Sequence, residues 1–174
     1  KTYCTSLLPG LFEKGDVDAD QRRKLVRELA KHLDEIRQDD LVRDALRLLP
    51  IVECACDEPT FLTADQVYFE SDLVTTVLGG QAPVTIEPDG DNVRDLLKEL
   101  GVETDPRPPD VVETARGVSQ LPHRTDAVSQ VEAILGFLAK DWPTGTPDGE
   151  LSLGPPLLRE WDLLKELEWL PRER

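Results

Sequence analysis

The chain has 174 residues, of which 39% are hydrophobic and 32% charged, a composition that suits one folded domain with a sizeable core. Thirty-five acidic residues against twenty basic ones give a net charge of -15, which disfavours direct binding to nucleic-acid phosphates or anionic membranes. No stretch approaches the roughly 20 apolar residues that span a bilayer, and the N-terminus lacks a signal-peptide pattern. We therefore expect a soluble protein.

Apolar residues at helical spacing characterise the first part of the chain. The clearest repeat covers residues 20–38, and Asp18 or Asp20 is available to cap the helix N-terminus. A second helix is predicted over residues 40–49. It is expected to stop there because Pro50 disfavours helical backbone at the residue before it.

The pattern then changes to short strand-like segments. Residues 51–56 alternate or run apolar, a turn-like stretch follows, and β-forming residues resume at 61–62 and 67–69. We predict that residues 51–69 form a small antiparallel sheet. Another short strand is expected over residues 84–86.

Four further helices are predicted between Ser71 and Leu138. Their starts carry capping residues or proline, and two of them end at glycine. Their ranges are 71–78, 91–100, 110–121 and 125–138. The last is expected to bury one apolar face, made of Val128, Val131, Ile134, Leu135 and Leu138. The predicted fold class is therefore α+β, helix-rich with a small antiparallel sheet.

The last part of the chain differs in composition. Residues 142–156 hold four prolines and three glycines without periodicity, which indicates a linker after a compact domain over residues 1–141. Residues 157–174 follow as an amphipathic docking helix, or as the start of a further unit. All three tryptophans fall in this last third, where they either dock the helix on the body or form a face for a partner. The candidate partner-binding residues are Trp161, Leu164, Trp169 and Leu170.

Both ends of the chain resemble the ends of a fragment taken from a longer sequence. The sequence starts at Lys1, contains no methionine, and stops inside a charged string after an apolar helix. We expect an internal piece of a larger protein.

Two strings resemble a recurring element of the very large sacsin-like and NO VEIN-like proteins. They are Leu-Leu-Pro-Ile-Val-Glu-Cys at 48–54 and Phe-Leu-Thr-Ala-Asp-Gln-Val-Tyr-Phe at 61–69. In that element a helix ends in Leu-Pro, a strand follows, and a Val-Tyr-Phe edge precedes a short helix. Residues 100–102 with 108–112 look like the next element, and residues 164–171 look like the start of another copy.

The resemblance implies a role in a large protein. Such proteins carry a histidine-kinase or Hsp90-type ATPase domain upstream of these segments, and bacterial relatives are often associated with defence against phage. It implies no catalytic residue here, because the ATP-site signatures of that domain have no match. The string Asp89-Gly90-Asp91 lacks the second glycine of an Asp-x-Gly-x-Gly turn.

Three aspartates at alternate positions, Asp16, Asp18 and Asp20, have the spacing of the first three calcium ligands of an EF-hand loop. An EF-hand loop needs glycine at its sixth position and glutamate at its twelfth, where this chain has Gln21 and Arg27. Helix capping explains the aspartates better, with adventitious cation binding as the alternative.

The three cysteines, at positions 4, 54 and 56, lack the paired spacing of structural zinc sites, and His32 and His123 do not supply it. We expect buried strand cysteines without a Cys54–Cys56 disulfide and without bound metal, in a reducing cytoplasm. Metal binding and redox chemistry are the alternatives.

The basic cluster Arg22-Arg23-Lys24 with Arg27 shares its helix with several acids, so a salt-bridged solvated face is predicted in place of a phosphate site. Nucleophile, phosphate-loop and metalloprotease motifs are absent from the sequence. No catalytic, cofactor-binding or metal-binding residue is therefore nominated, and no cofactor is expected.

The predicted function is a non-catalytic interaction or scaffold module of a larger, ATP-driven chaperone-like or defence protein. Its partners would be adjacent domains of the same chain or a second copy of it. The alternatives are a free-standing acidic inhibitor that mimics nucleic acid, and an enzyme of unrecognised type.

Overall fold

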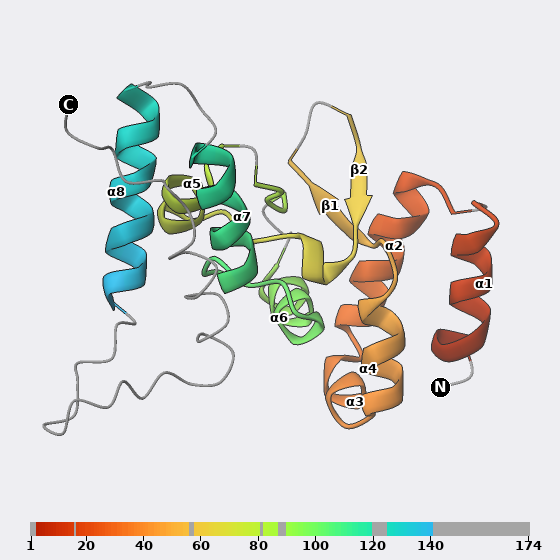
Figure 1. Cartoon of the computed structure of the whole chain (residues 1–174). Coiled ribbons are helices and arrows are strands. Elements are labelled where there is room, and N and C mark those ends of the chain that lie inside the picture. Colours follow the sequence, from red (N-terminus) through yellow and green to blue (C-terminus); the bar gives the residue numbers. More distant parts are fainter. Residues whose placement is uncertain are drawn as a thin grey trace, which may run out of the picture. The chain divides into compact units, whose positions relative to one another are not determined.

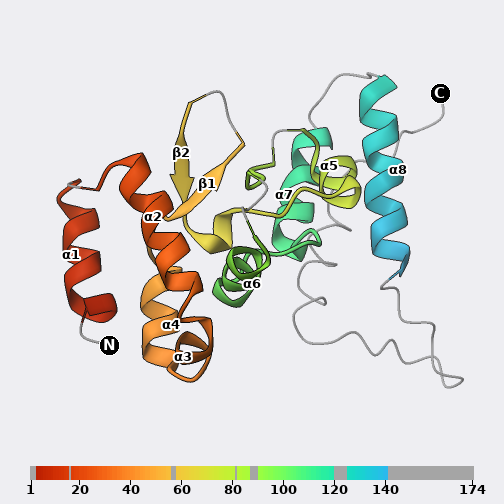
Figure 2. The same cartoon turned by 180° about the vertical axis from the view of Figure 1, so that it is seen from behind.

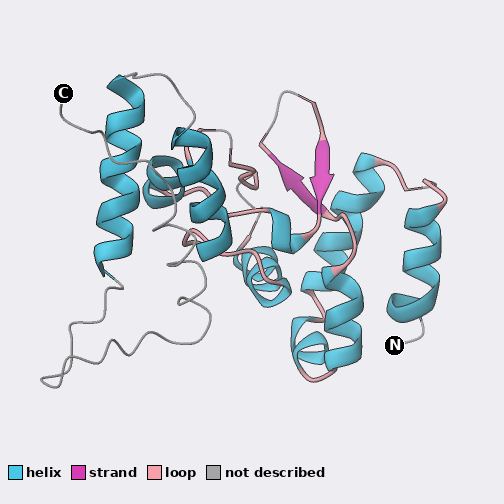
Figure 3. Ribbon diagram, viewed as in Figure 1, coloured by secondary structure: helices cyan, strands magenta, loops and turns pink. Residues whose placement is uncertain are grey.

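The computed structural model describes residues 3–15, 17–55, 58–80, 82–86, 90–119 and 125–140. In these residues helices predominate and one pair of strands forms an antiparallel sheet, which confirms the predicted α+β class (Figure 3). The described residues within 1–71 and 82–104 form one compact unit, and those within 72–81 and 105–140 belong to a second. The predicted linker at 142–156 and helix at 157–174 lie outside the described residues, so the predicted domain boundaries stay predictions.

The first unit begins with a π-helical turn, η1 (Tyr3–Leu7), that continues into α1 (Leu8–Glu13). The next helix, α2 (Ala19–Ala30), starts at Asp18 with a capping box. The Asp18 carboxylate accepts a hydrogen bond from the Gln21 main-chain N–H at 2.8 Å, and the Gln21 side chain accepts one from the Asp18 N–H at 3.0 Å. Such a cap stabilises a helix by about 1 kcal/mol, and the predicted cap at Asp18 is confirmed.

The single helix predicted over residues 20–38 is wrong, because α2 ends at Ala30 and a separate helix, α3 (Leu33–Arg37), follows. The main-chain N–H groups of Lys31 and His32 donate to carbonyls three residues earlier, which closes a tight turn in place of further α-helical bonds. The apolar side chains of α3 are buried beyond that turn. Neither glycine nor proline marks the break.

Helix α4 covers Asp40–Arg47, with Asp39 as its N-cap residue, and ends before Pro50 as predicted. The chain then forms β1 (Val52–Cys54) and β2 (Thr60–Leu62), which pair in antiparallel fashion with Glu53 opposite Phe61. The small antiparallel sheet predicted after Pro50 is confirmed in this pair.

Isolated bridges extend this ladder with segments that are distant in sequence. Thr85 lies antiparallel to Cys54, next to β1, which places the predicted strand 84–86 on the side of β1 away from β2. Tyr68 forms parallel bridges with Val84 and with Glu103. Residues 67–69 are therefore not an antiparallel neighbour of β2, contrary to the prediction, because a 3₁₀ turn, η2 (Ala64–Gln66), intervenes.

The core of the first unit lies between this ladder and the helices. Helix α6 (Asp91–Leu100) packs against α2, α3 and α4, with Leu96 and Leu100 fully buried (Figure 1). It ends at Gly101, whose φ of 107° lies in the left-handed region where glycine is favoured.

The second unit contains α5 (Asp72–Leu78), α7 (Pro108–Ser119) and α8 (Thr125–Lys140), all three in mutual contact (Figure 2). The helices are those predicted, with α7 starting two residues earlier. The predicted face of α8 is partly wrong. Val131 and Ile134 are buried, whereas Val128 and Leu135 are 50% and 41% exposed; the Leu138 side chain lies outside the described residues.

The correction to α8 has a structural reason. Its contact with α5 and α7 uses a narrower stripe, centred on Ile134 and continued by Ala133 and Phe137. In the described part of the chain, no helix is long and apolar enough to cross a membrane.

Candidate functional site

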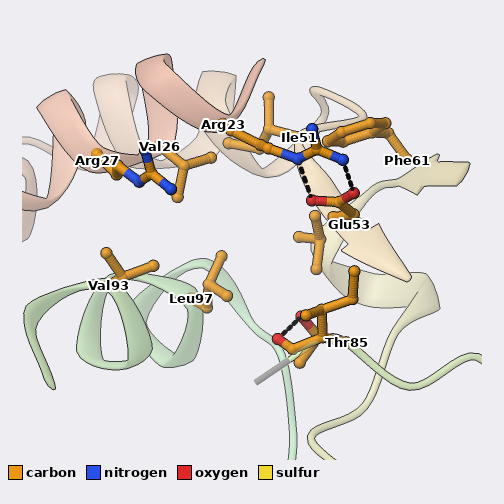
Figure 4. Close-up of a pocket in the computed structure, with 11 residues that line it drawn as sticks. Arg23, Val26, Arg27, Ile51, Glu53, Phe61, Thr85, Val93 and Leu97 are labelled. Atoms are coloured by element: carbon orange, nitrogen blue, oxygen red, sulfur yellow. Dashed lines mark hydrogen bonds and ion pairs between the residues drawn. The ribbon is translucent and has the colours of Figure 1, made fainter. Parts of the chain in front are cut away.

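A pocket of about 310 Å³ opens on the first unit between α2, α6 and the ladder (Figure 4). Helix α2 contributes Arg23, Val26 and Arg27, which share a face because they lie three and four residues apart. Val93 and Leu97 of α6 line the opposite side at the same helical spacing. The size is at the lower end of the range for small-molecule sites.

The ladder supplies the remaining wall. Glu53 of β1 and Phe61 of β2 are directly opposite each other, so their side chains project on the same face of the sheet. Ile86 follows on the other side of β1, where its N–H donates to the Glu53 carbonyl at 3.1 Å. The pocket therefore combines apolar walls with one charged pair.

That pair joins α2 to β1. The Arg23 guanidinium donates from Nε to Glu53 Oε2 at 2.7 Å and from Nη2 to Glu53 Oε1, and from Nη1 to Asp20 at 2.9 Å (Figure 4). The hydrogen bonds to Glu53, followed by the attraction of its charge, raise the pKa of Arg23 above its usual value, so the guanidinium stays charged.

The polar side chains of the pocket form hydrogen bonds within the chain. Both Glu53 oxygens are held by Arg23, and the Thr85 hydroxyl donates to the Ile86 carbonyl at 3.0 Å. Among the described residues that line the pocket there is no histidine or cysteine.

The basic cluster of α2 is divided between three roles. Arg22 lies between two phenyl rings, with its guanidinium carbon 5.0 Å from the Phe12 centroid and 5.1 Å from the Phe61 centroid, and its Nη1 donates to the Pro50 carbonyl at 2.8 Å. Arg23 binds Glu53, and Arg27 lines the pocket. The predicted solvated face is thus wrong for Arg22, which connects α1, α2 and β2.

The acids of the first helices pair with bases three residues further on, as a salt-bridged surface requires. These pairs are Asp20–Arg23, Glu28–Lys31, Asp34–Arg37, Asp40–Arg43 and Asp44–Arg47. Such i,i+3 pairs satisfy charge locally and leave little net field on α2, α3 and α4.

Among the described residues, no group of three or more His, Cys, Asp or Glu side chains is placed to hold a metal ion. Cys54 is buried in β1 and Cys4 is half-buried. Asp16 and Cys56 lie outside the described residues.

A second feature of the first unit is an exposed apolar surface that the sequence did not single out. Tyr3, Leu7 and Leu11 are spaced by four residues along η1 and α1 and are all exposed, as are Leu41 of α4 and Leu48, the C-cap residue of α4. Because η1 packs against α4, these two stripes lie on contacting elements. We call the five residues the η1–α4 surface. The signal that could have revealed it is an apolar repeat wider than one packing face needs.

The candidate partner-binding residues Trp161, Leu164, Trp169 and Leu170 lie outside the described residues, so the structure does not place them. Comparison with known families, curated proteins and solved structures finds no match to this chain. The sacsin-like resemblance therefore stays a prediction.

Proposed function

We propose that the chain is a non-catalytic interaction or scaffold module that binds another protein through the η1–α4 surface. The observation that carries the proposal is the exposure of five large apolar side chains on η1, on α1 and at α4, where η1 contacts both helices. Leu41 and Leu48 lie two helical turns apart, on one side of α4, with 64% and 78% of their surfaces exposed. Exposed large apolar side chains gathered on neighbouring elements are typical of protein-binding sites.

Charge supports the same surface. Residues 1–50 carry ten basic and ten acidic side chains, whereas residues 51–93 carry nine acidic side chains and no basic one. The η1–α4 surface therefore belongs to the electrically balanced part of a chain with a net charge of -15. A second copy, or an adjacent acidic domain, meets least repulsion there.

The wider setting belongs to the same proposal. The resemblance of residues 48–69 to sacsin-like proteins favours a large chaperone-like or defence protein in which another domain hydrolyses ATP. Adjacent domains of that protein, or a second copy of this chain, are the proposed partners. The three cysteines form no even disulfide framework, which favours a reducing cytoplasm as the compartment.

The acidic-inhibitor alternative draws on residues 51–93, where Glu58, Asp65 and Glu70 are exposed. The two functions separate by mutation. Charge reversal at these three positions abolishes binding of a basic target by an inhibitor. It leaves binding through the η1–α4 surface intact.

A photo-crosslinking experiment tests the proposal directly. Benzoylphenylalanine is placed at Leu48 or, as the matched control, at the exposed Leu135 of α8, and the chain is irradiated at increasing concentration and in lysate of its native host. We expect a discrete product at position 48, containing either a second copy or one recurrent protein, and none at position 135. The double variant Leu41→Glu/Leu48→Glu should abolish it, and Val128→Glu/Leu135→Glu should not.

These variants change exposed side chains, so circular dichroism and melting temperature should stay near those of the unmodified chain. Equal crosslinking at both positions, or none at position 48, would contradict the proposal.

A further inference from the structure

A groove of about 430 Å³ runs between α5 and α8 on the second unit. Asp72, Leu73, Thr76 and Val77 line it from α5, with Asp72 at the first position of that helix, and Ala133, Gly136 and Phe137 line it from α8. The Thr76 hydroxyl donates to the main-chain carbonyl of Asp72, so its hydrogen-bonding capacity is used within α5. The groove therefore offers mainly apolar contacts.

Gly136 widens the groove on the α8 side. A methyl group built at this position meets no atom within 4 Å, although glycine inside a helix is less favourable than alanine. Val131 and Ile134 of the same helix are buried in the core. Ala133, Gly136 and Phe137 form the neighbouring stripe of α8, and the groove along this stripe has room for a further side chain.

We propose that residues 157–170 of this chain bind in the α5–α8 groove, with Leu157, Trp161 and Leu164 facing it. These three side chains recur at spacings of four and three, the pattern of a single helical stripe. One indole ring with two leucines on adjacent turns provides apolar contacts that match the apolar lining of the groove.

The covalent connection favours this occupant over any separate molecule. Residues 141–156 join the end of α8 to Leu157, and sixteen residues reach up to about 50 Å when extended. The groove residues of α8 lie within seven positions of Lys140, about 10 Å along the helix. A tether of this length holds the segment at an effective concentration in the millimolar range.

Docking of that stripe leaves other apolar residues of the segment uncovered. Leu163, Leu167 and Leu170 share a second stripe, and Trp169 falls on a third side of a helix, away from both stripes. This second stripe is available to a partner while the first is bound. The inference is independent of the η1–α4 surface, which lies on the other unit.

Intrinsic fluorescence tests the docking, because all three tryptophans lie at positions 142, 161 and 169. In the full chain carrying Trp142→Phe and Trp169→Phe, only Trp161 emits. We expect blue-shifted emission and several-fold slower acrylamide quenching than for a free indole, both unchanged on dilution. Loss of the blue shift on dilution would show that a second copy supplies the segment, which overturns the proposal.

Two matched pairs of variants locate the contact. Gly136→Phe fills the groove and should shift Trp161 emission to the red, whereas Gly117→Phe, at an equally open helical glycine of α7, should not. Thr76→Arg puts a charge into the groove, whereas Thr75→Arg changes the exposed neighbour that does not line it.

Circular dichroism confirms that each variant is folded before its emission is compared. A free-indole spectrum in the unmodified background would overturn the proposal. So would a buried Trp161 that responds to neither Gly136→Phe nor Thr76→Arg, since the segment would then pack elsewhere.

Discussion

Arg22 illustrates how one side chain can connect three elements. Its guanidinium stacks between Phe12 and Phe61 and donates to the Pro50 carbonyl, which joins α1, β2 and the end of α4 to α2. Arginine suits this place because its planar group can stack on aromatic rings and donate at its edge at the same time.

Arg22→Lys should therefore lower the free energy of unfolding by about 1–2 kcal/mol, since the charge remains while the stacking and the directed hydrogen bond are lost. Urea denaturation followed by circular dichroism measures the change. Lys24→Arg, at an exposed position of the same helix, is the matched control and should have little effect. Equal midpoints for both variants would show that the stacking contributes nothing.

Glu99 gathers three arginines at the end of α6. Its carboxylate accepts from Arg37 Nε at 3.3 Å and from Arg43 Nη1 at 3.4 Å, and its main-chain carbonyl accepts from Arg47 Nη2 at 3.1 Å. The carboxylate is 25% exposed, so solvent screens it less than a surface acid. These bonds connect α3 and α4 to α6.

Glu99→Gln should destabilise the protein by about 1 kcal/mol, because both arginines lose a charged acceptor while the shape is kept. Glu28→Gln, whose carboxylate forms an exposed pair with Lys31, should cost less than about 0.5 kcal/mol. Thermal melts at low and at moderate salt measure both. A larger effect at Glu28 than at Glu99 would contradict the importance of partial burial.

Sequence patterns predicted some residue roles and not others. Asp18 was recognisable as a cap because capping depends on local spacing, and the structure confirms it. Arg22 was not, because its partners Phe12, Pro50 and Phe61 lie far apart in sequence. Three consecutive basic residues in a sequence do not indicate which side chain packs against the rest of the protein.

At the scale of whole elements, the contribution of a glycine to stability depends on whether it lies inside a helix or at the end of one. Gly117 lies inside α7 with open space at the position of a Cβ, whereas Gly101 ends α6 with a φ of 107°. Alanine is favoured in the first setting and strained in the second.

We expect Gly117→Ala to raise the free energy of unfolding by about 0.5–1 kcal/mol and Gly101→Ala to lower it by about 1 kcal/mol. The pair is measured by urea denaturation under one set of conditions. Effects of the same sign would mean that one of these backbone conformations differs from the one described.

The helices that the sequence predicted well end at a residue that signals a stop, since α4 ends before Pro50 and α6 ends at Gly101. The break between α2 and α3 was missed because it comes from main-chain hydrogen bonding at Lys31 and His32, with no residue that signals a stop. The exposure of Val128 and Leu135 was missed for another reason. Periodicity shows which positions are apolar, whereas neighbouring helices decide how wide a stripe is covered.

At the scale of the molecule, the ladder of the first unit draws on five stretches of chain. Residues 84–86 and 103 complete it from beyond α5, which belongs to the other unit. Local patterns could predict the strands but not their pairing, since non-local pairing leaves no periodic signal. The candidate pocket depends on it, because Thr85 and Ile86 form part of its wall.

A fragment of residues 1–71 should therefore fail to fold cooperatively, because it lacks α6 and three members of the ladder. A fragment of residues 1–104 contains the whole first unit and should show a cooperative thermal transition. Circular dichroism melts of the two fragments distinguish these outcomes. A cooperative transition in the shorter one would mean that α1 to β2 suffice.

The chain passes from the first unit into the second at residue 72 and returns at residue 82, and this path sets the order in which the two units can fold during synthesis. When residue 104 leaves the ribosome the first unit can close, but α5 is already outside and its partners α7 and α8 have yet to be made. A helix of seven residues does not persist alone in water. During synthesis the apolar residues of α5 are therefore exposed to solvent until α7 and α8 have been made. A ribosome-associated chaperone can bind the nascent chain at this stage.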